Sequence, residues 1–148
     1  MSTHLTVYLA FPGTAREAME LYHSVFGGTL QITTYAQANP TAAPEDWDKI
    51  AHGQVVTRSG LAIMGADVAT GTPYHPGTPL ASLSLMGEDA DEIRGYWDAL
   101  VVGGTVQMPF EPAPWGDVFG LVTDRFGVEW KVNATPSDRL SPAEPVAV

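Results

Sequence analysis

The chain has 148 residues, a formal net charge of −10 and no cysteine, so disulfides, thiolate nucleophiles and cysteine-based metal sites are excluded. Its length fits one domain, or two small halves that share a core, and 45% hydrophobic residues suffice to build that core. Only seven residues are Lys or Arg, so the basic surface that binds nucleic acid or an anionic membrane is missing.

No segment approaches the roughly 18 consecutive apolar residues that a membrane-spanning helix needs. The first residues, MSTHLTVYLAF, also lack the basic region that precedes the apolar run of a secretory signal. We therefore expect a cytoplasmic protein without a membrane partner.

The first half of the chain predicts one helix among four strands. A helix is expected to begin at Thr14, because Thr14 and Glu17 have the spacing of a capping box. Strands are expected at 5–11, 29–36, 52–58 and 61–66, with a hairpin turn at 58–60 and one possible helical turn at 44–47 inside the loop 37–49.

Residues 68–79 are rich in Gly, Pro and Thr and are interpreted as a linker. The second half then repeats the order of the first. A second helix is expected from Asp89, again with a capping-box glutamate at Glu92, and strands are expected at 80–87, 105–110, 117–124 and 128–133. Residues 111–116 are expected to form a loop, and residues 135–148 a proline-rich tail that is either exposed or an arm on a partner subunit.

The two helical stretches have the same pattern. When they are aligned on their caps, apolar residues fall at the same positions, and both stretches end in Gly-Gly-Thr-aliphatic-Gln. The matching positions are Ala18, Tyr22, Val25 and Phe26 in the first stretch, and Ile93, Trp97, Leu100 and Val101 in the second. The predicted fold is therefore α+β, with two βαβββ modules (about 4–67 and 80–134) forming a curved mixed sheet with helices outside and a central cup.

Three segments resemble one known family. YLAFPGTAREAMELYHSVFGG, HGQVVTRSGLAIMGAD and WGDVFGLVTDRFGVEWKVN are similar to the PhnB-like branch of the vicinal-oxygen-chelate superfamily, which includes glyoxalase I, extradiol dioxygenases and bleomycin-resistance proteins. The resemblance covers about residues 4–134 and implies a single glyoxalase-like domain and a homodimer. Members of this branch are often labelled as demethylubiquinone methyltransferases. The residues here give no methyltransferase signal, because the glycines follow helices or lie in hairpin turns and do not form a glycine-rich loop after the first strand of a parallel sheet.

The resemblance also indicates where a metal would bind. The metalloenzymes of the superfamily place two ligands on the first and last strands of each module. The approximate counterparts here are Thr6 or Val7, Met64, Leu80 and Lys131. None is an imidazole or a carboxylate, so we expect neither a metal nor another cofactor.

The four histidines are scattered along the chain and do not form a close-spaced ligand set. His23 and His75 are expected at the surface, whereas His4 could turn into the cup. His52 could be a polar group of the pocket or make a structural hydrogen bond.

Four further residues are candidates for binding a ligand. Glu129 and Lys131 alternate with apolar neighbours and therefore share one face of the last strand, either inside the cup or on a solvated edge. Trp115 lies in the loop 111–116 and could close over a ligand, or fill its own domain or a dimer interface. Tyr8 lines either the cup or the core, depending on a one-residue register.

Two functions follow from these residues and the resemblance. The first is metal-independent binding of a small apolar or aromatic molecule, for sequestration or sensing as in bleomycin-resistance proteins. The alternative is a metal-dependent lyase, isomerase or dioxygenase with atypical ligands such as His4, His52 and Glu129. A structural or regulatory dimer without a small ligand is a third possibility.

Overall fold

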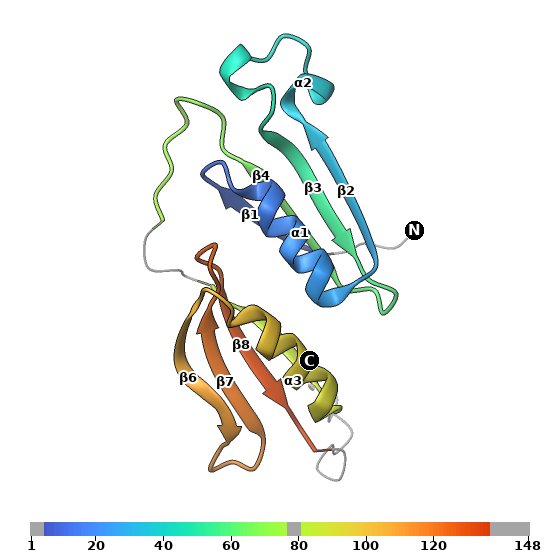
Figure 1. Ribbon diagram of the computed structural model, residues 1–148, viewed down its shortest axis with the longest axis vertical. Helices are drawn as coiled ribbons and strands as arrows, with labels where there is room; N and C mark the ends of the chain where they lie inside the picture. The colour runs from blue at the N-terminus through green and yellow to red at the C-terminus, as the bar shows by residue number, and fades with distance from the viewer. Residues whose placement is uncertain (1–4, 77–80, 137–148) are drawn as a thin grey trace, which may run out of the picture. The chain divides into compact units, whose positions relative to one another are not determined.

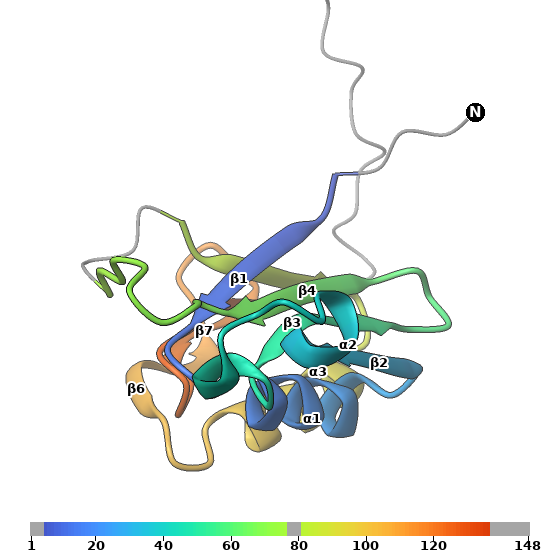
Figure 2. The same cartoon turned by 90° about the horizontal axis from the view of Figure 1, so that it is seen from above.

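The computed structural model describes residues 5–76 and 81–136, and it divides into two compact units, Met1–Gly77 and Thr78–Val148. Each unit contains a four-stranded sheet with one long helix on one of its faces (Figure 1). Seen from above, the long helix of the first unit again lies against a single face of its sheet (Figure 2). Among residues 5–76 and 81–136, no long helix covers the opposite face of either sheet.

The first unit contains a mixed sheet in the order β1-β4-β3-β2. Its elements are β1 (Val7–Phe11), α1 (Ala15–Phe26), β2 (Thr29–Thr34), α2 (Tyr35–Ala38), the 3-10 turn η1 (Pro44–Asp46), β3 (Ile50–Val56) and β4 (Ala62–Asp67). Strands β1 and β4 run parallel, and the other neighbours are antiparallel.

The second unit follows the same path, with the strand order β5-β8-β7-β6. Its elements are β5 (Leu83–Gly87), α3 (Ala90–Leu100), β6 (Thr105–Pro112), β7 (Val118–Thr123) and β8 (Glu129–Ala134). Strands β5 and β8 run parallel, as β1 and β4 do. The predicted α+β class and the two βαβββ modules are confirmed, with the strands hydrogen-bonded as two sheets of four.

Helix α1 packs on β3 and β4 through a stripe of buried side chains, of which Tyr22 and Met19 are fully buried. Gly53 allows this close approach, because a Cβ added there would lie 2.9 Å from Cγ of Met19. A Cβ added to Gly65 would lie 2.9 Å from Cε2 of Phe11 in β1, so this second glycine makes room for the Phe11 ring.

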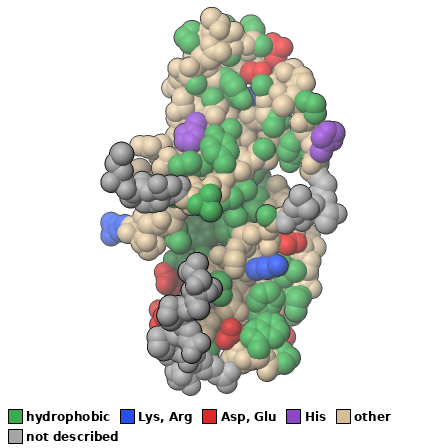
Figure 3. Space-filling model, turned by 180° about the vertical axis from the view of Figure 1, so that it is seen from behind, with side chains coloured by type: hydrophobic (Ala, Val, Ile, Leu, Met, Phe, Trp, Pro, Cys, Tyr) green, Lys and Arg blue, Asp and Glu red, His purple; other side chains and the backbone are tan. Residues whose placement is uncertain are grey.

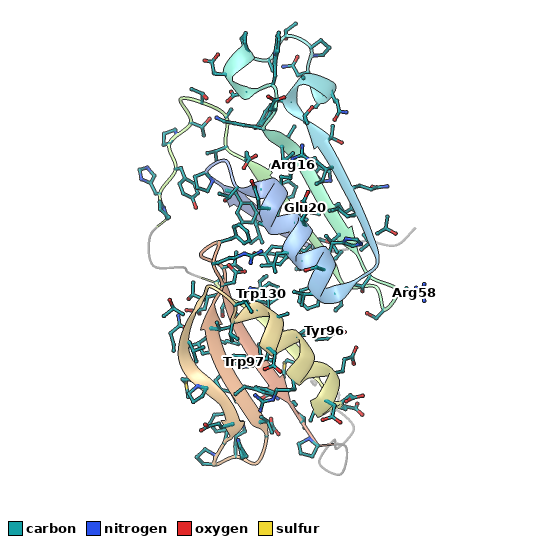
Figure 4. All side chains as sticks on the ribbon, in the orientation of Figure 1. Arg16, Glu20, Arg58, Tyr96, Trp97 and Trp130 are labelled. Carbon is teal, nitrogen blue, oxygen red and sulfur yellow. The ribbon has the colours of Figure 1, made fainter. Side chains whose placement is uncertain are left out.

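Helix α3 buries Ile93, Trp97 and Leu100, as the spacing predicted. The Trp97 ring stacks on Phe110 of β6 with 5.6 Å between the ring centroids, and Trp130 of β8 is also buried (Figure 4). An added Cβ on Gly120 would lie 2.6 Å from Cζ3 of Trp97, so this glycine makes room for the indole.

The predicted capping box at Thr14 is wrong. The Thr14 side chain makes no cap hydrogen bond, and the first N–H of α1, from Ala15, donates instead to Oδ1 of Asp67 at 2.8 Å. Asp67 is buried, and its Oδ2 also accepts from the Ile50 N–H at 2.9 Å. Helix α3 has only half of its predicted capping box: Asp89 accepts from the N–H groups of Asp91 and Glu92, whereas the Glu92 carboxylate accepts from the Tyr96 hydroxyl.

Several strand boundaries differ from the prediction, and at two of them the structure shows the reason. Strand β2 ends at Thr34 and not at residue 36, because Thr34 and Gln37 form a capping box that begins α2. Strand β6 continues to Pro112, two residues into the predicted loop, since Glu111 and Pro112 pair with Phe119 and Val118 of β7. The predicted turns at 58–60 and 44–47 are confirmed. Among the described residues, none of the helices has the length and apolar character needed to span a membrane.

Candidate functional site

The side chains on the face of the first sheet opposite α1 are set by strand alternation. Ile63, Gly65 and Asp67 of β4 lie on the face that α1 covers. The residues of β4 that alternate with these three therefore lie on the uncovered face. The residues of β1 and β3 that pair with them lie on the same face. This uncovered face carries Tyr8, Ala10, His52, Gln54, Met64 and Ala66. It is the side of the unit that is seen from behind, where hydrophobic and polar side chains lie exposed together (Figure 3).

Tyr8 and His52 form a hydrogen-bonded pair on this face. The Tyr8 hydroxyl lies 3.0 Å from Nδ1 of His52, and the ring centroids are 5.7 Å apart. Partial burial, with a smaller contribution from nearby Tyr35, raises the pKa of the Tyr8 phenol. The phenol is therefore protonated, and its O–H can donate a hydrogen bond to the imidazole. The register left open by the sequence places Tyr8 away from the core, with 54% of its surface exposed.

The uncovered face of the second sheet carries Glu129 and Lys131. Their neighbours Trp130 and Val132 are buried on the α3 side, so the predicted alternation of β8 is confirmed. Lys131 pairs in register with Ser84 on one side and Leu121 on the other. Exposed apolar side chains flank them, since Met86 and Met108 are 67% and 46% exposed. This face therefore combines a few polar groups with accessible apolar surface.

Trp115 lies beside the same face. Its loop is closed by hydrogen bonds from the Ala113 N–H to the Asp117 carbonyl at 2.7 Å and from the Gly116 N–H to the Ala113 carbonyl at 2.8 Å. The indole meets the Phe119 ring edge-on with 5.6 Å between centroids, and 57% of Trp115 is exposed. Two aromatic rings in this geometry offer both a face and an edge to a flat molecule.

The sequence analysis missed two features of this second face. Phe119 is one, although the alternation of Phe119, Leu121 and Thr123 could have identified it. The other is a polar network in which Asn133 Nδ2 donates to Asp117 Oδ2 and to Thr135 Oγ1, each at 3.0 Å. Only the β7–β8 pairing brings these three residues together, so no local pattern marks them.

The remaining predicted polar residues lie apart from these faces or outside the described chain. His23 Nε2 is 3.3 Å from the Gly28 carbonyl, and His75 is exposed. His4 and Leu80 lie outside the described residues. Within residues 5–76 and 81–136, no group of three or more His, Asp or Glu side chains could hold a metal ion.

A family model described as 3-demethylubiquinone-9 3-methyltransferase matches residues 3–133. The chain belongs to this family. The crystal structure of PA1353 from Pseudomonas aeruginosa is 39% identical, with a TM-score of 0.82 over 92% of this chain and 100% of that one. A PhnB protein from Bacillus cereus is 26% identical, with a TM-score of 0.72 over 90% and 100% of the two chains.

Protein YjdN of Escherichia coli (strain K12) is 26% identical over 137 residues, which are 87% of this chain and 93% of that protein. A more distant likeness places the family in the glyoxalase fold. Glyoxalase I from Zea mays is 13% identical, with a TM-score of 0.58 over 90% of this chain and 44% of that one. The PhnB-like, glyoxalase-fold assignment made from the sequence is therefore confirmed.

Proposed function

We propose that this protein binds a small apolar or aromatic molecule without a metal ion, for sequestration or sensing. One observation carries the proposal: all five predicted ligand-binding residues lie on or against sheet faces that the helices leave uncovered. Tyr8 and His52 lie on the first face, and Glu129 and Lys131 on the second, where Trp115 contacts Phe119. Small-molecule sites are lined by apolar and aromatic side chains with a few placed polar groups, and these faces supply both kinds of side chain.

The side chains at the superfamily's ligand positions support binding without a metal. Thr6 or Val7, Met64 and Lys131 offer neither an imidazole nor a carboxylate, and an ammonium at Lys131 repels a divalent cation. The methyl transfer in the family's description is not part of this proposal. A methyl-donor site would need a glycine-rich loop in a parallel sheet, whereas here Pro12 and Gly13 join β1 to α1 in a mixed sheet.

A thermal-shift screen with aromatic compounds tests this function. After dialysis against a chelator, we expect at least one compound to raise the melting temperature, because a ligand that binds only the native state stabilises it. At a ligand concentration of about 100 times Kd the gain is about 2.7 kcal/mol. Elemental analysis of the undialysed protein accompanies the screen. One bound metal per chain, with binding lost on chelation and restored by the metal, would favour the metal-dependent alternative.

Two tryptophan variants locate the binding. Trp115→Ala removes the exposed indole beside Phe119 and is expected to abolish the ligand-induced shift while the circular dichroism spectrum stays unchanged. Trp47→Ala is the matched control, because Trp47 is a second exposed tryptophan, in the loop that precedes β3. The control should keep the full shift. A full shift in Trp115→Ala would remove Trp115 from the site.

We also propose that the protein is a homodimer. Each four-stranded sheet has two outer strands, β1 and β2 in one unit and β5 and β6 in the other. Outer strands present unpaired N–H and C=O groups that an assembly can cover. Light scattering coupled to size-exclusion chromatography should give twice the mass of the chain, and a monomer mass at all concentrations would contradict this proposal.

A further inference from the structure

The Tyr8–His52 pair joins two strands that are not neighbours. Tyr8 lies on β1 and His52 on β3, with β4 between them. On the same face, Ala10 and Ala66 pair across β1 and β4. Their methyl groups rise little above the sheet, so a flat surface lies next to the two rings. A planar molecule could rest there within the first unit alone.

The direction of this hydrogen bond decides which group the pair presents. When the Tyr8 phenol donates to Nδ1, the single proton of a neutral imidazole lies on Nε2. This Nε2–H makes no hydrogen bond to any residue of 5–76 or 81–136. In this arrangement His52 presents an N–H donor, and the hydrogen bond to Tyr8 holds the orientation of its ring.

The charge of the first sheet indicates what this donor binds. None of the four strands, VYLAF, TLQITT, IAHGQVV and AIMGAD, contains Lys or Arg. Their one acidic residue, Asp67, is buried on the α1 side. These strands carry no fixed positive charge that could balance a bound anion. A neutral hydrogen-bond acceptor therefore fits the His52 N–H better than a carboxylate does.

We propose that His52, positioned by Tyr8, recognises the carbonyl oxygen of a flat, conjugated ligand whose ring lies on Ala10 and Ala66. This inference rests on the proposed function and names the chemical class of the molecule bound. In it His52 contacts the ligand, whereas Tyr8 is a positioning residue that acts through the imidazole.

Three naphthalene probes of similar shape test this class by equilibrium dialysis. 2-Acetylnaphthalene carries a ketone, 2-ethylnaphthalene has the same carbon skeleton without the oxygen, and 2-naphthoate carries a carboxylate. One added hydrogen bond should make the ketone bind about threefold to tenfold more tightly than the ethyl compound. The carboxylate should bind no more tightly than the ketone.

Variants of the pair assign the preference to its residues. His52→Phe keeps a flat ring without the donor, so the ketone and the ethyl compound should bind it equally. His52→Gln supplies an amide N–H and should restore part of the preference. Tyr8→Phe should lower the preference without lowering binding of the ethyl compound. His23→Phe, in α1, is the control and should bind like the parent protein.

Equal binding of the ketone and the ethyl compound by the parent protein would overturn the inference and leave the proposed function standing. The same holds if His52→Phe, with an unchanged circular dichroism spectrum, keeps the full preference. Tighter binding of 2-naphthoate than of the ketone would also overturn the inference, because it would show that His52 recognises an anion and not a neutral carbonyl. If none of the three probes binds, the inference fails, and the compound screen decides the function separately.

Discussion

The buried carboxylate of Asp67 is expected to be a large single contribution to the stability of the first unit. Its two oxygens accept from the N–H groups of Ala15 and Ile50, at 2.8 and 2.9 Å, and both donors are buried. Asp67→Ala leaves both N–H groups without this acceptor, and each unsatisfied buried donor costs about 1–3 kcal/mol of folding free energy. We therefore expect the free energy of unfolding to fall by about 3–5 kcal/mol. Asp67→Asn keeps one acceptor oxygen and should lose about half as much.

Thr14→Ala is the control for this prediction. If the Thr14 side chain capped α1, as the sequence indicates, its removal would cost about 1 kcal/mol. Because its side chain makes no cap hydrogen bond, we expect a change within about 0.5 kcal/mol. Urea unfolding followed by far-UV circular dichroism measures all three variants. A Thr14→Ala loss equal to that of Asp67→Ala would refute the assignment of the cap to Asp67.

Two further predictions concern stability. Hydrogen bonds from Lys49 and, to a smaller extent, Thr70 lower the pKa of the Asp46 carboxyl below its ordinary value of 3.8. The ionised carboxylate therefore stabilises the folded protein fully above pH 3.8, and this stabilisation is lost as the pH falls through the lowered pKa. The difference between the urea midpoints of the parent and Asp46→Asn should shrink as pH drops below about 4, and a constant difference would contradict it. Gly120→Ala should destabilise by about 1–3 kcal/mol, because its Cβ would overlap Trp97. Gly95→Ala, in α3 with nothing within 4 Å, should instead stabilise by about 1 kcal/mol, and equal effects of the two would show that the Trp97 contact is not tight.

Local patterns in the sequence determined much of the fold. The helical spacing in 14–31 and 89–107 placed α1 and α3, and the repeated order of elements predicted two modules with the same strand path. The alternation around Trp130 placed Glu129 and Lys131 on one face. These signals depend on residues within a few positions of one another, which is why they can be read without coordinates.

The tertiary structure alone decided the contacts between distant segments. Asp67 caps a helix 52 positions away, and Tyr8 meets His52 across 44 positions. Both contacts depend on strand register, and a shift of one residue would move each side chain to the opposite face. The sequence of this protein therefore predicted candidate ligand-binding residues, and strand pairing decided which of them meet.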